Sequence, residues 1–103
     1  RFVRLKSAPL SQVARLIPKR GNVLDFGCGS CPLEFEYFQK SSGPRFFVFD
    51  IDEKKLGYIK KASTWLTICQ SWAEIETNGP YDCILLIDGS VCTFIETATP
   101  TQF

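Results

Sequence analysis

A short apolar run that closes on a glycine loop constrains this chain more than any other feature. Val23-Leu24-Asp25-Phe26 is followed at once by Gly27-Cys28-Gly29, and then by Pro32. An apolar run closed by glycine, with proline at the next helical start, is typical of a strand, a tight turn and a helix. Glycines let the backbone approach a ligand with no Cβ in between. The segment therefore predicts a βα unit whose loop can bind a small molecule.

Two more apolar runs, Phe46–Phe49 and Cys83–Ile87, lack the alternation of a half-exposed strand, which favours strands buried on both faces of a parallel sheet. Leu66–Cys69 is a further short strand between them. Helices are predicted between them, over roughly residues 8–17, after Pro32 and after Asp52. Alternating strands and helices predict an α/β fold: a Rossmann-like parallel sheet with helices on both faces.

Length and composition fit one soluble globular domain over residues 1–103. The chain is 45% hydrophobic and 22% charged, which is enough apolar material for one core but not for two. No apolar run approaches the ~20 residues that span a bilayer, and residues 1–10 lack the apolar stretch of a signal peptide. We therefore expect a cytoplasmic protein without membrane contact.

The absence of histidine excludes several kinds of catalytic and metal site. A Cys/His zinc site, a Ser-His-Asp triad and a histidine general base are all excluded, and no metal site is expected. Three of the five cysteines lie in apolar runs and are interpreted as buried thiols. Residues 1–24 hold six Lys or Arg and no acid. We interpret this basic segment as a solvated helix face and a loose terminus, with contact to phosphate as the alternative.

A carboxylate is expected beside the glycine loop. Asp50 ends the second predicted strand, 23 residues after Gly27. The carboxyl ends of neighbouring parallel strands meet at one crevice, where a carboxylate can hold the two hydroxyls of a ribose. Loop and acid together predict a site of nucleoside type.

Both segments resemble the class I S-adenosylmethionine-dependent methyltransferase family. Val23 through Gly29 matches its pattern of two apolar residues, an acid and Gly-x-Gly, and Asp50-Ile51-Asp52 matches its second-strand acid. The resemblance implies that Asp25 and the loop of Gly27, Cys28 and Gly29 face the methionine moiety of S-adenosylmethionine. It implies that Asp50 holds the ribose and that the next residue, Ile51, also contacts the cofactor.

The remaining cofactor contacts implied by this resemblance are Ser71, Trp72 and Asp88. Ser71 and Trp72 follow the third strand, where the family binds adenine, and Asp88 ends the fourth. The implied activity is methyl transfer. The acceptor is left open among RNA, a protein and a small molecule. Asp88-Gly89-Ser90 lacks the Asn/Asp-Pro-Pro-aromatic pattern of enzymes that methylate amino groups of nucleobases, and no catalytic base is identified.

Two alternatives use the same residues differently. Cys28-Gly29-Ser30-Cys31 is a Cys-x-x-Cys at a helix start, where the helix dipole can create a reactive thiolate, as in thioredoxin-like dithiol oxidoreductases. The other alternative is a non-catalytic module that binds the cofactor only.

The sheet of the resembling family has seven strands, of which about four are assigned here. Residues 91–103 carry no assignment, so the strand Cys83–Ile87 is expected to be an open edge. An apolar open edge is a template for association. We therefore expect a fragment of a longer chain, with its missing C-terminal strands or a partner chain at this edge.

Overall fold

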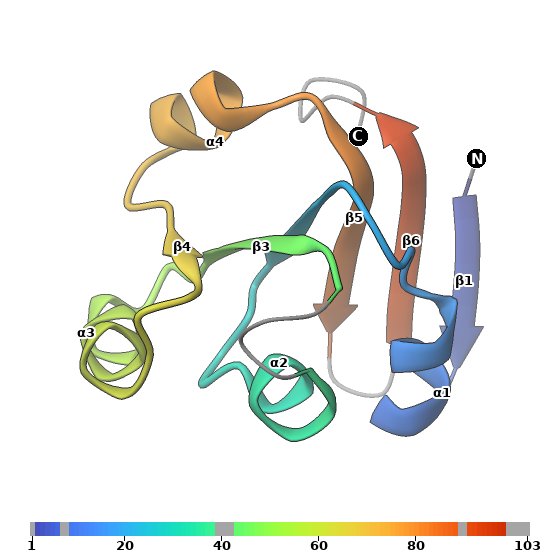
Figure 1. The fold of residues 1–103 in the computed structure, drawn as a ribbon, viewed down its shortest axis with the longest axis horizontal. Helices are drawn as coiled ribbons and strands as arrows, with labels where there is room; N and C mark the ends of the chain where they lie inside the picture. Colours follow the sequence, from blue (N-terminus) through green and yellow to red (C-terminus); the bar gives the residue numbers. More distant parts are fainter. Residues whose placement is uncertain (1, 7–8, 39–42, 89–90, 99–103) are drawn as a thin grey trace.

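The computed structural model describes residues 2–6, 9–38, 43–88 and 91–98, drawn in colour in Figure 1. The strands are β1 (Phe2–Lys6), β2 (Asn22–Phe26), β3 (Arg45–Phe49), β4 (Thr67–Ile68), β5 (Tyr81–Asp88) and β6 (Val91–Ala98). The helices are α1 (Leu10–Leu16), α2 (Pro32–Tyr37), α3 (Glu53–Ala62) and α4 (Trp72–Asn78). No described helix is long and apolar enough to cross a membrane.

One sheet contains all six described strands, in the order β1-β6-β5-β2-β3-β4. The four strands predicted from the apolar runs, β5, β2, β3 and β4, are parallel neighbours. Val23 of β2 lies opposite Phe46 on one side and Cys83 on the other. The fold is therefore α/β and Rossmann-like, as predicted.

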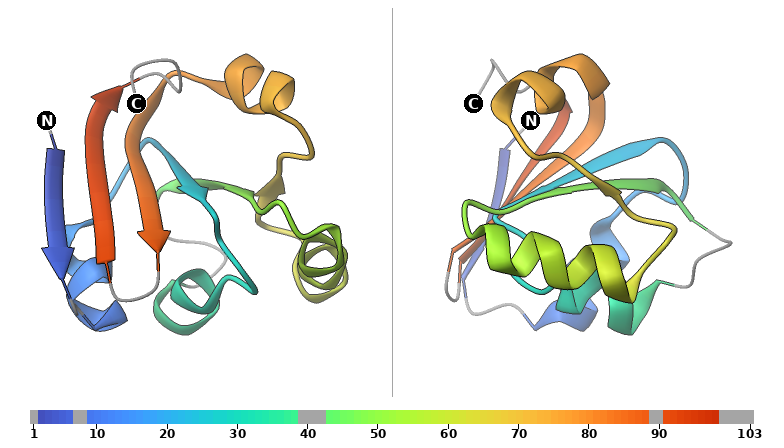
Figure 2. Two further views of the ribbon diagram at one scale, coloured as in Figure 1. Left: turned by 180° about the vertical axis from the view of Figure 1, so that it is seen from behind. Right: turned by 90° about the vertical axis from the view of Figure 1, so that its left-hand side faces the viewer.

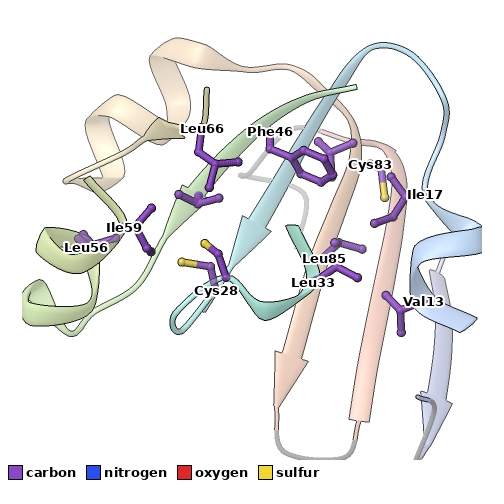
Figure 3. Close-up of a cluster of buried hydrophobic side chains, with 13 residues drawn as sticks. Val13, Ile17, Cys28, Leu33, Phe46, Leu56, Ile59, Leu66, Cys83 and Leu85 are labelled. Atoms are coloured by element: carbon purple, nitrogen blue, oxygen red, sulfur yellow. The ribbon is translucent and has the colours of Figure 1, made fainter. Parts of the chain in front are cut away.

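Helices cover both faces of this sheet, but unequally. Figure 2 shows α4 on one side of the parallel strands and α1, α2 and α3 on the other. Successive side chains of β2 belong to different cores, as expected for a strand. Val23 belongs to the cluster under α1–α3, and Leu24 belongs to the cluster under α4. Figure 3 shows the larger cluster, in which Cys28 lies among apolar groups that include Leu33 and Ile59.

The expectation of an open edge at β5 is wrong. β5 pairs with β2 on one side and with β6, antiparallel, on the other. The segment Val91–Ala98, unassigned from the sequence, is rich in β-branched residues and forms β6. β1 in turn covers β6, so the N-terminal segment is a strand where we expected a loose terminus. The predicted partner chain or additional strands have no open edge to occupy at β5.

Gly57 offers a direct test of the α3 assignment. It lies inside the helix, and a Cβ built on it meets nothing within 4 Å. Glycine in a helix interior costs about 0.5–1 kcal/mol relative to alanine. Gly57→Ala should therefore raise the free energy of unfolding by about that amount in urea denaturation.

Gly29→Ala is the matched control. Its added Cβ also meets nothing within 4 Å, but the residue has a φ of +60°. Left-handed backbone costs a residue with a Cβ about 1 kcal/mol or more. Gly29→Ala should therefore lose stability, and a Gly57→Ala variant that also loses stability would contradict the α3 assignment.

Candidate functional site

The loop after β2 is fastened to the carboxyl end of β3. The backbone N–H groups of Gly27 and Cys28 both donate to the carbonyl oxygen of Phe49, at 2.8 and 2.9 Å. Gly27 and Gly29 have φ values of +81° and +60°, which glycine adopts without strain. The two glycines therefore allow a turn tight enough to place three loop residues against the neighbouring strand.

Asp50 completes this connection with its side chain. Its Oδ2 accepts from the N–H of Gly29 at 2.8 Å, and its Oδ1 accepts from the N–H of Asp52 at 2.9 Å. A carboxylate has about four acceptor positions, so each oxygen of this half-buried side chain keeps one for a further donor. The structure thus brings the two sequence-predicted parts of the site, loop and acid, into direct contact.

Apolar side chains neighbour the loop and Asp50. The ring centroid of Phe26 lies 5.4 Å from that of Phe49. It lies 6.1 Å from the ring centroid of Trp72, and these two rings meet edge to face. Trp72 is 43% exposed, and Ile51, next to Asp50, is 91% exposed. A carboxylate beside exposed apolar side chains suits a ligand with hydroxyl groups and a flat ring.

Ser71 has a structural role that the sequence prediction missed. Its hydroxyl accepts from the N–H of Glu74 at 3.2 Å, and the Glu74 carboxylate accepts from the N–H of Gln70. Ser71 is therefore the N-cap of α4. The spacing Ser-x-x-Glu, which is typical of a helix start, is the signal that could have identified it.

Asp25 lies beneath the loop. It is 1% exposed, and its register neighbours on β3 and β5 are the buried Val48 and Leu85. Glu34 of α2, 0% exposed, is the other buried acid among the residues whose side chains the structure describes. Neither Asp25 Oδ1 nor either oxygen of Glu34 receives a hydrogen bond from a fixed donor of another described residue. The two acids interact with one another instead.

Burial determines the protonation of these two acids. Desolvation, followed by the charge of Asp25 and the hydrogen bond to it, raises the pKa of Glu34 to about 11. Desolvation also raises the pKa of Asp25, although the hydrogen bond with Glu34 opposes this shift. Glu34 is therefore the member of the pair that keeps its proton at neutral pH, and this proton can be donated to Asp25. Nothing in the sequence pattern identified Glu34, because an acid on a short helix is ordinarily exposed.

The Cys-x-x-Cys segment lacks the surroundings of a reactive dithiol. Cys28 and Cys31 are 5% and 0% exposed. A hydrogen bond with Cys28 and burial raise the pKa of the Cys31 thiol, whereas a redox-active thiol needs a lowered pKa. The four parallel strands also match the predicted Rossmann-like sheet. These observations argue against the oxidoreductase alternative.

The structure brings some of the predicted site residues together and not others. Gly27 and Cys28 bond to the strand end just before Asp50, and Gly29 bonds to Asp50 itself. Ile51 is exposed next to Asp50 in the sequence, and the exposed Trp72 contacts the ring of Phe26. Asp25 is buried below the loop, so its predicted contact with a ligand stays a prediction. Asp88 ends β5, and its side chain lies outside the described residues. Within the described ranges no three His, Cys, Asp or Glu side chains group as metal ligands.

Matches to known proteins are found among solved structures alone. No protein-family model matches the chain, and no curated protein matches it. A crystal structure of a dimethyladenosine transferase from Plasmodium falciparum is similar, with a TM-score of 0.48 and 24% identity. The match covers 78% of this chain and 31% of the other, so the chain spans less than a third of that protein. The Rossmann-like assignment rests on the strand order itself.

Removing the Asp50 carboxylate should loosen the loop even without a ligand. Asp50→Ala loses two hydrogen bonds to backbone N–H groups, and we expect a loss of about 1–2 kcal/mol in the free energy of unfolding, measured in urea. Hydrogen exchange at the Gly29 amide should become faster because its acceptor is gone.

Asp82→Ala is the matched control for this variant. Asp82 accepts from the N–H of Asn22 at 2.8 Å, at the amino end of β2 and away from the loop. Its removal should leave exchange at Gly29 unchanged. Equal exchange at Gly29 in Asp50→Ala and in the wild type would show that Asp50 does not hold the loop.

Proposed function

We propose that this chain binds S-adenosylmethionine at the carboxyl ends of β2 and β3 and serves methyl transfer. The observation that carries the proposal is the hydrogen bond between the Gly29 N–H and Asp50. It joins a glycine loop and an acid at the crevice where open parallel sheets bind ligands. The resemblance of both segments to class I methyltransferases supplies the identity of the cofactor.

The residues fit the parts of this cofactor. The position of a Cβ on Gly29 is open, so the methionine moiety can lie against the loop backbone. The free acceptor positions of Asp50 suit the two ribose hydroxyls. Ile51 and Trp72 present apolar surface for adenine, and Ser71, already the cap of α4, keeps its hydroxyl proton for donation. Asp88 stays a proposed contact at the end of β5.

When bound, S-adenosylmethionine supplies a methyl group on a sulfonium sulfur, which a nucleophile takes by direct displacement. This chain contributes orientation, because the loop and Asp50 hold two parts of one ligand. Fixed geometry alone can lower the activation barrier by several kcal/mol, on the order of 7–11 kcal/mol in favourable cases. A binding-only module is the second candidate, because no described side chain is identified as a general base for an acceptor.

Calorimetric titration of the purified chain with S-adenosylmethionine tests the binding proposal. The wild type should bind, and Asp50→Ala should bind roughly 10 to 150 times more weakly, or about 1.5–3 kcal/mol, since two charge-assisted bonds to the ribose are lost. Asp82→Ala removes a carboxylate at the opposite end of the strands and should leave the dissociation constant within about twofold.

A second variant separates ligand contact from loop stability. Asp50→Asn keeps the size of the side chain and an acceptor oxygen for the Gly29 N–H, but it removes the charge. Weaker binding with nearly wild-type stability would support direct contact with the ribose. No measurable binding by a folded wild-type chain would contradict the proposal. Binding without formation of S-adenosylhomocysteine from RNA, protein or small-molecule acceptors would favour the binding-only module.

A further inference from the structure

Two buried acids stand at the two ends of the glycine loop. Asp25 lies on β2, two residues before Gly27, and Glu34 lies in the first turn of α2. Both side chains are almost completely buried, at 1% and 0% exposure. Their interaction therefore connects the strand that enters the loop to the helix that leaves it.

The surroundings of these acids allow only one negative charge. Asp25 is flanked in the sheet by the apolar Val48 and Leu85. Among the residues whose side chains the structure describes, the other groups that act on the two carboxyls are Asp50 at the end of β3 and the thiols of Cys28 and Cys31, none of which brings a positive charge. Two buried carboxylates without a cation repel one another and lose their hydration. One proton must stay between them.

We propose that Glu34 is a positioning residue, which shares one proton with Asp25 and thereby holds the glycine loop in the shape that binds the cofactor. The part of this proposal that concerns the cofactor rests on the proposed function; the part that concerns the loop does not. Loss of the shared proton at alkaline pH then opens the loop and weakens binding.

The direction of the pH effect follows from linkage. The ordinary pKa of Glu34 is 4.5, and in the folded protein its pKa is raised to about 11. Between these values the closed loop holds a proton that an opened, hydrated loop releases. Each pH unit in this range therefore favours the open form by up to about tenfold. The stabilising effect of the proton is complete below pH 4.5 and is lost as the pH rises toward 11.

Glu34→Gln is the matched variant for the test. Its amide donates to Asp25 as the protonated carboxyl does, but it cannot release that proton. In cofactor-free protein, hydrogen exchange at Cys28 and Gly29 should accelerate with pH more steeply in the wild type than in Glu34→Gln, by up to about tenfold per pH unit. Parallel profiles in the two proteins would overturn the proposal.

Cofactor affinity gives the second readout. Dissociation constants for S-adenosylmethionine should agree in wild type and Glu34→Gln at pH 6, and the wild type should bind at least about tenfold more weakly at pH 9.5 as the competent loop becomes depopulated. The amino group of the cofactor itself titrates near pH 8, as α-amino groups do, and the comparison at equal pH cancels this contribution. Equal affinities at pH 9.5 would remove Glu34 from cofactor positioning.

The two readouts separate the two proposals. If neither protein binds the cofactor but their exchange profiles diverge, the proposed function is contradicted and the proposal of a shared proton is supported. If both bind and the exchange profiles are parallel, the proposal of a shared proton is contradicted and the proposed function is supported. Should Glu34→Gln not fold, the double variant Asp25→Asn with Glu34→Gln replaces it, since its two amides can hydrogen-bond to one another and neither titrates, and its profile should again be shallower than that of the wild type.

Discussion

The hydrogen bonds between the loop after β2 and the end of β3 are the interaction on which the rest of the site depends. Three consecutive N–H groups, of Gly27, Cys28 and Gly29, find acceptors on Phe49 and Asp50. Because the three donors find their acceptors at the end of one strand, the loop cannot shift without breaking several bonds at once. The same contacts place open loop backbone beside a carboxylate, and a site of nucleoside type follows from the way the chain satisfies its own backbone.

The parallel part of the sheet could be predicted because its signal is local. Phe46–Phe49 and Cys83–Ile87 are continuous apolar runs, and Val23–Phe26 is interrupted only by Asp25, so these segments favour burial on both faces of the sheet. The antiparallel part could not, because it depends on contacts between opposite ends of the chain. Phe2 of β1 lies opposite Ile95 of β6, and no local pattern around either residue specifies that register. The error about the β5 edge has the same origin.

The candidate site divides along a similar line. Gly27, Gly29 and Asp50 were predictable because glycine spacing and an acid at a strand end are visible in the sequence. Ser71 was assigned to a ligand although its spacing to Glu74 predicts a helix cap. Glu34 could not be identified from the sequence, because the burial of a charged residue is decided by what packs around its helix and not by its own neighbours in the chain.

An acidic pair in an apolar core is not the most stable solution for that space. Apolar side chains of similar volume often replace buried ionic groups with no loss, or with a gain of about 1–4 kcal/mol. Asp25 and Glu34 therefore give the chain something other than stability. They enclose one turn of backbone, at the point where the sheet, the loop and Asp50 meet. Local rules of burial are broken where a protein carries its function, and here the exception and the candidate site coincide.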